Sequence, residues 1–143
     1  MRGARKPVPG LRSPRERVGG LVYLGRMVDK MRLAMAGKLP ADYQENLGKG
    51  FDKACCDFLG VGYAALQKRV HEGGSDAEIL AWCEKHGSPR NGEERKIWNE
   101  YLEKRGWRDE MSDRLVFRKQ ESGWGERDEI QTFFDYIDAD EGR

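Results

Sequence analysis

The sequence predicts an all-α fold: one compact domain of six or seven helices, joined by short loops that end in glycine. Apolar residues recur at the spacing of an amphipathic helix rather than at alternate positions. Only one threonine occurs in 143 residues, so the β-branched composition typical of strands is largely missing. The length is that of a single ordinary domain, and four tryptophans supply enough apolar bulk for one core.

The first helix is expected to run from Pro14 to Ala36. Ser13 and Glu16 have the spacing of a capping box, and Pro14 suits the first position of a helix. An apolar stripe follows at helical spacing, formed by Leu21, Leu24, Val28, Met31 and Met35. Glycines beside this face lower helix propensity, and we interpret them as allowing another backbone to pack closely: Gly19, Gly20 and Gly25.

The later helices are shorter, and most are closed by glycine. One helical turn is expected at 41–46, followed by helices at 51–59, 63–72, 75–85, 93–105, 109–122 and 126–137. Residues 1–10 contain two prolines and two glycines, and are expected to form a flexible basic arm ahead of the helical domain at 11–143. The acidic C-terminal residues are expected to fray.

The net charge of +1 conceals an asymmetry along the chain. Residues 1–38 hold ten Lys or Arg against two Asp or Glu, and residues 121–143 hold two against eight. One interpretation is that the basic segment binds nucleic acid. The other, which we favour, is that the two ends attract each other, within one chain or across a homodimer. Nucleic-acid-binding domains tend to be basic overall and to carry a recognisable motif, and none is visible here.

Cysteine content and hydropathy bear on the compartment. The three cysteines are an odd number, two of them adjacent, which is unlike a secreted disulfide framework. No apolar run approaches the length of a membrane span or follows the basic N-terminus as a signal-peptide core would. A cytoplasmic location is therefore expected. Cys83 and His86 lie three residues apart, but zinc sites use tighter ligand pairs, so no metal or cofactor is expected.

The best candidate anion site is the turn formed by Gly48, Lys49 and Gly50. It enters a predicted helix, and backbone N–H groups at a helix start beside a lysine can bind phosphate or carboxylate. Arg15, in the basic first helix, is a further candidate. The turn lacks the Lys-Ser/Thr pair of a phosphate-binding P-loop. The alternative is a tight turn that needs glycine for its backbone angles.

Cys55 and Cys56 are candidate reactive thiols. They lie in the first turns of a predicted helix, where a thiol pKa can be lowered. The alternative, which we favour, is that both are small hydrophobic residues of the core. No Ser/His/acid set can be assigned, because only two histidines occur and neither lies in a motif.

Four segments carry a resemblance to a known family. They are Leu11-Arg12-Ser13-Pro14-Arg15-Glu16, Asn46-Leu47-Gly48-Lys49-Gly50-Phe51-Asp52, Lys104-Arg105-Gly106-Trp107-Arg108-Asp109 and the final stretch from Asp135 to Arg143. Together they resemble a bacterial family of small proteins catalogued as a domain of unknown function. The resemblance spans nearly the whole chain and implies a stand-alone cytoplasmic protein, but it brings no catalytic residues.

Three hypotheses follow for the function. The first is a non-catalytic domain that recognises an anionic small molecule or a protein partner, because no catalytic set can be assigned. The second is an enzyme with a pocket between helices, using a cysteine or a carboxylate such as Asp52. The third is nucleic-acid binding through residues 1–38, which the low net charge disfavours.

Overall fold

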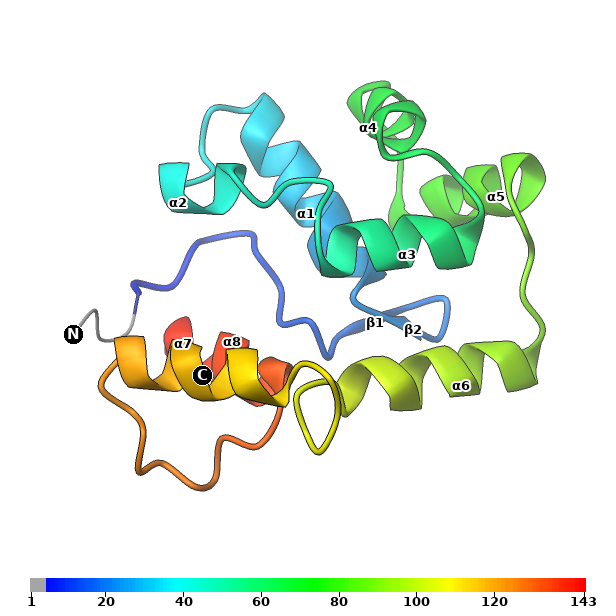
Figure 1. Cartoon of the computed structure of the whole chain (residues 1–143). Helices are drawn as coiled ribbons and strands as arrows, with labels where there is room; N and C mark the ends of the chain where they lie inside the picture. The colour runs from blue at the N-terminus through cyan, green and yellow to red at the C-terminus, as the bar shows by residue number, and fades with distance from the viewer. Residues whose placement is uncertain (1–4) are drawn as a thin grey trace.

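The computed structural model describes residues 5–143 as a mostly helical protein in two layers (Figure 1). The described residues contain eight helices and one hairpin: β1 (Arg17–Val18), β2 (Leu21–Val22), α1 (Leu24–Met35), α2 (Ala41–Gln44), α3 (Phe51–Leu59), α4 (Tyr63–His71), α5 (Asp76–His86), α6 (Gly92–Glu103), α7 (Ser112–Glu121) and α8 (Phe133–Asp140). Helices α1 to α5 lie on one side of the hairpin, and α6 to α8 lie on the other. The expected helical class is confirmed, with a small sheet added.

The expected helix from Pro14 to Ala36 is wrong in its first half. Residues 17–22 form an antiparallel hairpin instead, in which Arg17 pairs with Val22 and Val18 with Leu21. Its turn consists of Gly19 and Gly20 with φ of 56° and 78°. Two successive left-handed residues are the geometry of a tight hairpin turn, which the glycines allow at no steric cost.

The expected capping box of Ser13 and Glu16 is likewise not formed. The Ser13 hydroxyl donates to Asp138 near the C-terminus at 3.0 Å, and the backbone N–H of Arg15 donates to Ser13 Oγ at 3.2 Å. This local turn leads into the hairpin, and α1 then begins at Leu24. The other helices start and end within a few residues of their expected limits, except the last.

The last helix is α8, at Phe133–Asp140, instead of the expected 126–137. Thr132 is its true N-cap, because its side chain accepts from the Asp135 N–H and the Asp135 carboxylate accepts from the Thr132 N–H. The acidic end does not fray, since Glu141 is only 2% exposed. Ion pairs with basic residues of the N-terminal segment hold this end in place, such as that between Glu141 and Arg26.

The main core lies between α1 and helices α3 to α6, with Phe134 of α8 fully buried in it. A second cluster joins α7 to α8 and consists of Leu115, Ile130, Phe133 and Tyr136. Phe51 at the start of α3 packs against both clusters. Across residues 5–143, no helix has the length and apolar character needed to cross a membrane.

The flexible arm expected over residues 1–10 lies partly outside the described residues. Within the described part, the Arg5 N–H donates to the Asp140 carbonyl at 2.7 Å. The Arg5 guanidinium lies 3.0 Å from Asp42 and 3.2 Å from Asp140. Residues from Arg5 onward are therefore tied to α2 and α8.

Candidate functional site

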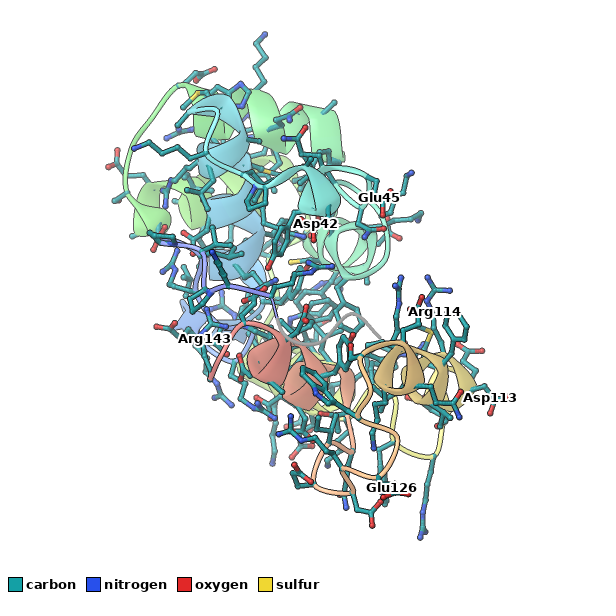
Figure 2. The ribbon with its side chains drawn as sticks, turned by 90° about the vertical axis from the view of Figure 1, so that its left-hand side faces the viewer. Asp42, Glu45, Asp113, Arg114, Glu126 and Arg143 are labelled. Atoms are coloured by element: carbon teal, nitrogen blue, oxygen red, sulfur yellow. The ribbon has the colours of Figure 1, made fainter. Side chains whose placement is uncertain are left out.

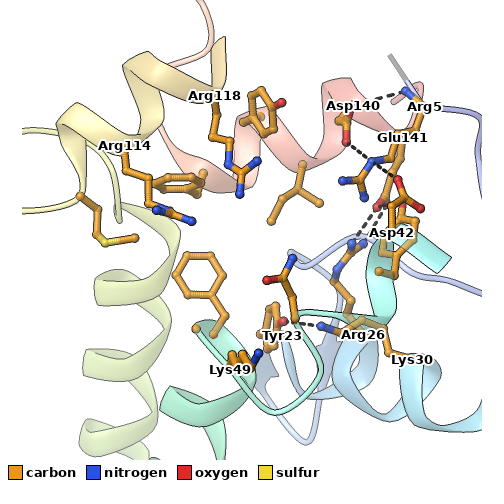
Figure 3. A pocket seen from close by; sticks show the side chains of 18 residues that line it. Arg5, Tyr23, Arg26, Lys30, Asp42, Lys49, Arg114, Arg118, Asp140 and Glu141 are labelled. Atoms are coloured by element: carbon orange, nitrogen blue, oxygen red, sulfur yellow. Dashed lines mark hydrogen bonds and ion pairs between the residues drawn. The ribbon is translucent and has the colours of Figure 1, made fainter. Parts of the chain in front are cut away.

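A pocket of about 240 Å³ opens between α7 and α8 on one side and α1, α2 and the loop before α3 on the other. Arg114 and Arg118 reach into it from α7, opposite Tyr23, Lys30 and Lys49 (Figure 3). Its apolar lining comes from Phe51, Met111, Phe133, Ile137 and the rings of Tyr43 and Tyr136. A small molecule with a charged group and a short apolar part matches these dimensions and this lining.

Cationic side chains outnumber carboxylates around the pocket. The cations are Arg5, Arg26, Lys30, Lys49, Arg114 and Arg118, and the carboxylates are Asp42, Asp140 and Glu141. Arg118 lies 3.3 Å from Glu121 on its own helix. Within residues 5–143, no carboxylate lies at ion-pair distance from Lys49 or Arg114. These two cations are the ones available to an incoming anion.

The floor of the pocket holds a buried lysine that contacts a carboxylate and a phenol. Lys30 Nζ lies 2.7 Å from Asp52 Oδ1 and donates to the Tyr23 hydroxyl at 3.0 Å. The Tyr23 hydroxyl in turn donates to Asp52 Oδ1 at 2.6 Å. Burial lowers the pKa of Lys30, although the negative Asp52 opposes this shift. Burial and the nearby Asp52 charge both raise the pKa of Tyr23, which keeps its hydroxyl protonated.

Tyr23 holds its position on a strained backbone. Its φ is 73°, a left-handed value that costs a bulky side chain about 1–3 kcal/mol. The Tyr23 N–H donates to the Pro14 carbonyl at 2.8 Å, and its ring packs edge-on against Phe51. This conformation links the hairpin to α1 and directs the phenol toward Asp52. Strain of this kind is concentrated at functional sites.

A second buried network closes the pocket beside α8. Arg26 donates to both carboxylate oxygens of Glu141, at 2.8 and 2.7 Å. Tyr43 and Arg143 donate to the same carboxylate at 2.8 and 2.9 Å. Burial alone would raise the pKa of Glu141, but hydrogen bonds and the charge of Arg26 outweigh it and lower the pKa. Arg143 also donates to the Leu11 carbonyl. In Figure 2, Arg143 and Arg114 lie on opposite sides of the molecule.

Only some residues of the predicted anion turn lie at the pocket. Lys49 and Gly50 line the pocket. The Gly48 N–H instead donates to Asp52 Oδ2 at 3.0 Å, so the protein's own carboxylate occupies this donor. Arg15 lies outside the pocket lining and pairs with Asp135 and Asp138 on α8. The turn therefore contributes one cation to the pocket rather than a cradle of N–H groups.

The candidate thiols lie in the core. Cys55 is 1% exposed and Cys56 is 3% exposed. Burial raises the pKa of Cys55 well above its ordinary value and raises the pKa of Cys56 to about 12. A reactive thiol needs access and a lowered pKa, so these properties favour the interpretation of core residues. Among the described residues, no group of three or more His, Cys, Asp or Glu is arranged to hold a metal ion.

Sequence reasoning missed Lys30, Arg114 and Arg118. Arg114 and Arg118 lie four residues apart, which places them on one face of α7. That spacing was visible in the sequence, but a pair of surface arginines is ordinary. Lys30 lies one turn after Arg26, and nothing in the sequence distinguishes a buried lysine from an exposed one.

The chain belongs to the DUF5069 family, described as a domain of unknown function, which it matches over residues 8–143. This confirms the domain-of-unknown-function family expected from the sequence. No curated protein matches the chain.

Proposed function

We propose that this protein binds an anionic small molecule in the pocket between α7, α8 and the loop before α3. The observation that carries the proposal is the excess of cations around the pocket, with Arg114 and Lys49 facing it without a carboxylate partner in the described chain. An acid group placed there would accept charge-assisted hydrogen bonds, which are among the stronger polar contacts in proteins. The apolar lining suits a short carbon skeleton beside that group.

Nucleic-acid binding by the basic segment has less support. Most of its cations are already engaged by acidic side chains of the same chain: Arg5, Arg12, Arg15, Arg17, Arg26, Lys30 and Arg32. Binding phosphates would require breaking these pairs. Three of these cations, Arg5, Arg15 and Arg26, pair with acidic residues of the C-terminal segment.

A protein partner is the second candidate, and one observation favours it. Ile97 and Tyr101 are 58% and 51% exposed on α6, and Trp107 is 48% exposed just after it. Exposed apolar residues that lie together are common at interaction surfaces. Sedimentation velocity over a range of concentrations tests the simplest such partner, a second copy of the chain.

The pocket proposal is tested by calorimetry with inorganic phosphate, citrate and glyoxylate as probes. Arg114→Ala and Lys49→Ala should each weaken binding about tenfold, because each removes one charge-assisted contact of about 1.5 kcal/mol. Lys96→Ala is the matched control, since Lys96 is an exposed lysine on α6 outside the pocket. If none of the three probes binds, or if the control weakens binding equally, the pocket does not have this role.

A further inference from the structure

Lys30 differs from the other lysines of the described chain. Among residues 5–143 it is the only buried lysine, and it is also a lining residue of the pocket. Its ammonium contacts Asp52 and Tyr23, and Arg26 lies one helical turn away. A purely structural role would explain the ion pair of Lys30 with Asp52. It would not explain why Lys30 lines a pocket that is surrounded by cations.

Lys53 provides an internal comparison. It pairs with Asp57 at 2.6 Å, nearly the distance of the Lys30–Asp52 pair, but on the exposed face of α3. Hydrogen bonding to Asp57 raises the pKa of Lys53, whereas burial lowers the pKa of Lys30 despite its carboxylate partner. The difference arises from the surroundings, because Lys30 is desolvated and lies near the positive Arg26. A desolvated lysine beside another cation is an activated nucleophile.

We propose that Lys30 is a nucleophilic amine that forms an imine with a small aldehyde or ketone carrying an acid group. The acid group would be held by Arg114 and Lys49, so this inference rests on the proposed binding function. Figure 3 shows Arg114 across the pocket from Lys30 and Tyr23, and Lys49 on the same side as Tyr23. The pocket would thus hold one end of the ligand by charge and react with the other.

The residues around Lys30 can carry every proton that the reaction moves. Asp52 takes a proton from the Lys30 ammonium, and the neutral amine attacks the carbonyl carbon to give a carbinolamine. Tyr23 donates a proton to the former carbonyl oxygen and is reprotonated by Asp52. Asp52 then takes a second proton from the nitrogen, and Tyr23 delivers a proton to the hydroxyl and is reprotonated by Asp52. The hydroxyl leaves as water, and a carbon–nitrogen double bond forms. The sum is the Lys30 ammonium plus the carbonyl giving a protonated imine plus water, with no oxidant or reductant.

Reductive trapping tests the proposal on the wild-type protein. The protein is incubated at neutral pH with glyoxylate and sodium cyanoborohydride, which reduces an imine to a stable secondary amine. Intact mass and peptide mapping then report how many adducts form and on which lysine. We expect one dominant adduct on Lys30, formed at least tenfold faster than adducts on the exposed lysines. Inorganic phosphate should slow it by competing for the same cations.

Three comparisons separate chemistry from general lysine reactivity. Propanal, which lacks the acid group, should label Lys30 more slowly than glyoxylate does. Arg114→Ala should slow the glyoxylate adduct, while Lys96→Ala should leave it unchanged. Lys30→Arg should abolish the adduct, and circular dichroism checks that this variant remains folded. Because the adduct is mapped on the wild type, the result does not depend on that variant folding.

The outcomes distinguish this inference from the binding proposal. Glyoxylate that binds by calorimetry but gives no adduct on Lys30 would overturn the nucleophile and leave the pocket intact. Adducts spread over the exposed lysines, with Lys30 unlabelled, would overturn it as well. If glyoxylate neither binds nor reacts, and phosphate and citrate do not bind, both proposals fail together.

Discussion

Two buried ion pairs shape the pocket at the level of single residues. Lys30 with Asp52 forms part of its floor, and Arg26 with Glu141 forms the wall beside α8. The sequence could not identify either pair, because their members lie 22 and 115 positions apart and each is an ordinary surface residue type. Their burial depends on tertiary packing. Removing one partner of such a pair leaves an uncompensated buried charge, which is why these positions dominate the predictions.

Glu141→Gln should lower the free energy of unfolding at pH 7 by about 3 kcal/mol, because Arg26 then keeps its buried charge without a carboxylate. The pKa of Glu141 is lowered in the folded state, so its stabilising contribution is present above its unfolded value, about 4.5, and is lost as the pH falls through the folded value. Urea unfolding between pH 7 and pH 3 measures both effects.

The pH profile separates the charge effect from simple loss of packing. Wild-type stability should fall below pH 4.5, and the Glu141→Gln variant should lose less over the same range. Glu45→Gln is the control, because Glu45 is exposed on the surface of the molecule and should leave both stability and profile unchanged. Parallel profiles for the wild type and Glu141→Gln would contradict this assignment of the pKa shift.

At the level of elements, local sequence signals predicted the short helices well. They failed at the hairpin and at the last helix, where tertiary contacts determine the local structure. Helix α3 was expected at its true limits, and the helix expected at 75–85 is α5, which begins after a capping box formed by Ser75 and Glu78. The hairpin was missed because Ser13 and Glu16 imitate a helix start. The adjacent glycines Gly19 and Gly20 were the available signal for a tight turn.

The same glycines give a prediction that distinguishes a hairpin from a helix. Alanine at either position would stabilise a helix by about 1 kcal/mol. In the hairpin both positions have positive φ, so Gly20→Ala should destabilise the protein by about 1–2 kcal/mol. Gly19→Ala should cost more, since its Cβ would lie 2.1 Å from a methyl carbon of the buried Leu80. Thermal unfolding of both variants gives the order, and a gain in stability would refute the hairpin.

At the scale of the whole molecule, the opposite charges of the two ends explain how the chain closes on itself. Arg5, Arg15 and Arg26 each contact an acidic residue of α8 or of the turn after it. The sequence predicted this attraction but left open whether it acts within one chain or between two. The structure shows these contacts within one chain, and the members of the Arg5 and Arg26 pairs line the pocket. The closing of the chain therefore also builds the candidate site.

Phe51 packs between the two clusters of the core, and Phe134 of α8 is itself buried in the main cluster. The Phe51 ring packs edge-on against Tyr23 of the main cluster and against Phe133 of the second cluster. We therefore expect α1 and α8 to unfold together in the wild type, with the same urea midpoint in hydrogen-exchange mass spectrometry. Phe51→Ala should remove this link, so α8 should exchange at a lower urea concentration than α1.

Phe58→Ala is the matched control for this coupling. Phe58 lies on the same helix and stacks on Trp98, but it packs only against the main cluster. Both substitutions should lower the free energy of unfolding, each by on the order of 2 kcal/mol for a partly buried ring. Only Phe51→Ala should separate the midpoints of α1 and α8. If both variants keep one shared midpoint, Phe134 and the ion pairs at the chain ends, rather than Phe51, hold α8 against the main core. Glu141→Gln combined with Phe51→Ala would then be the variant that separates them.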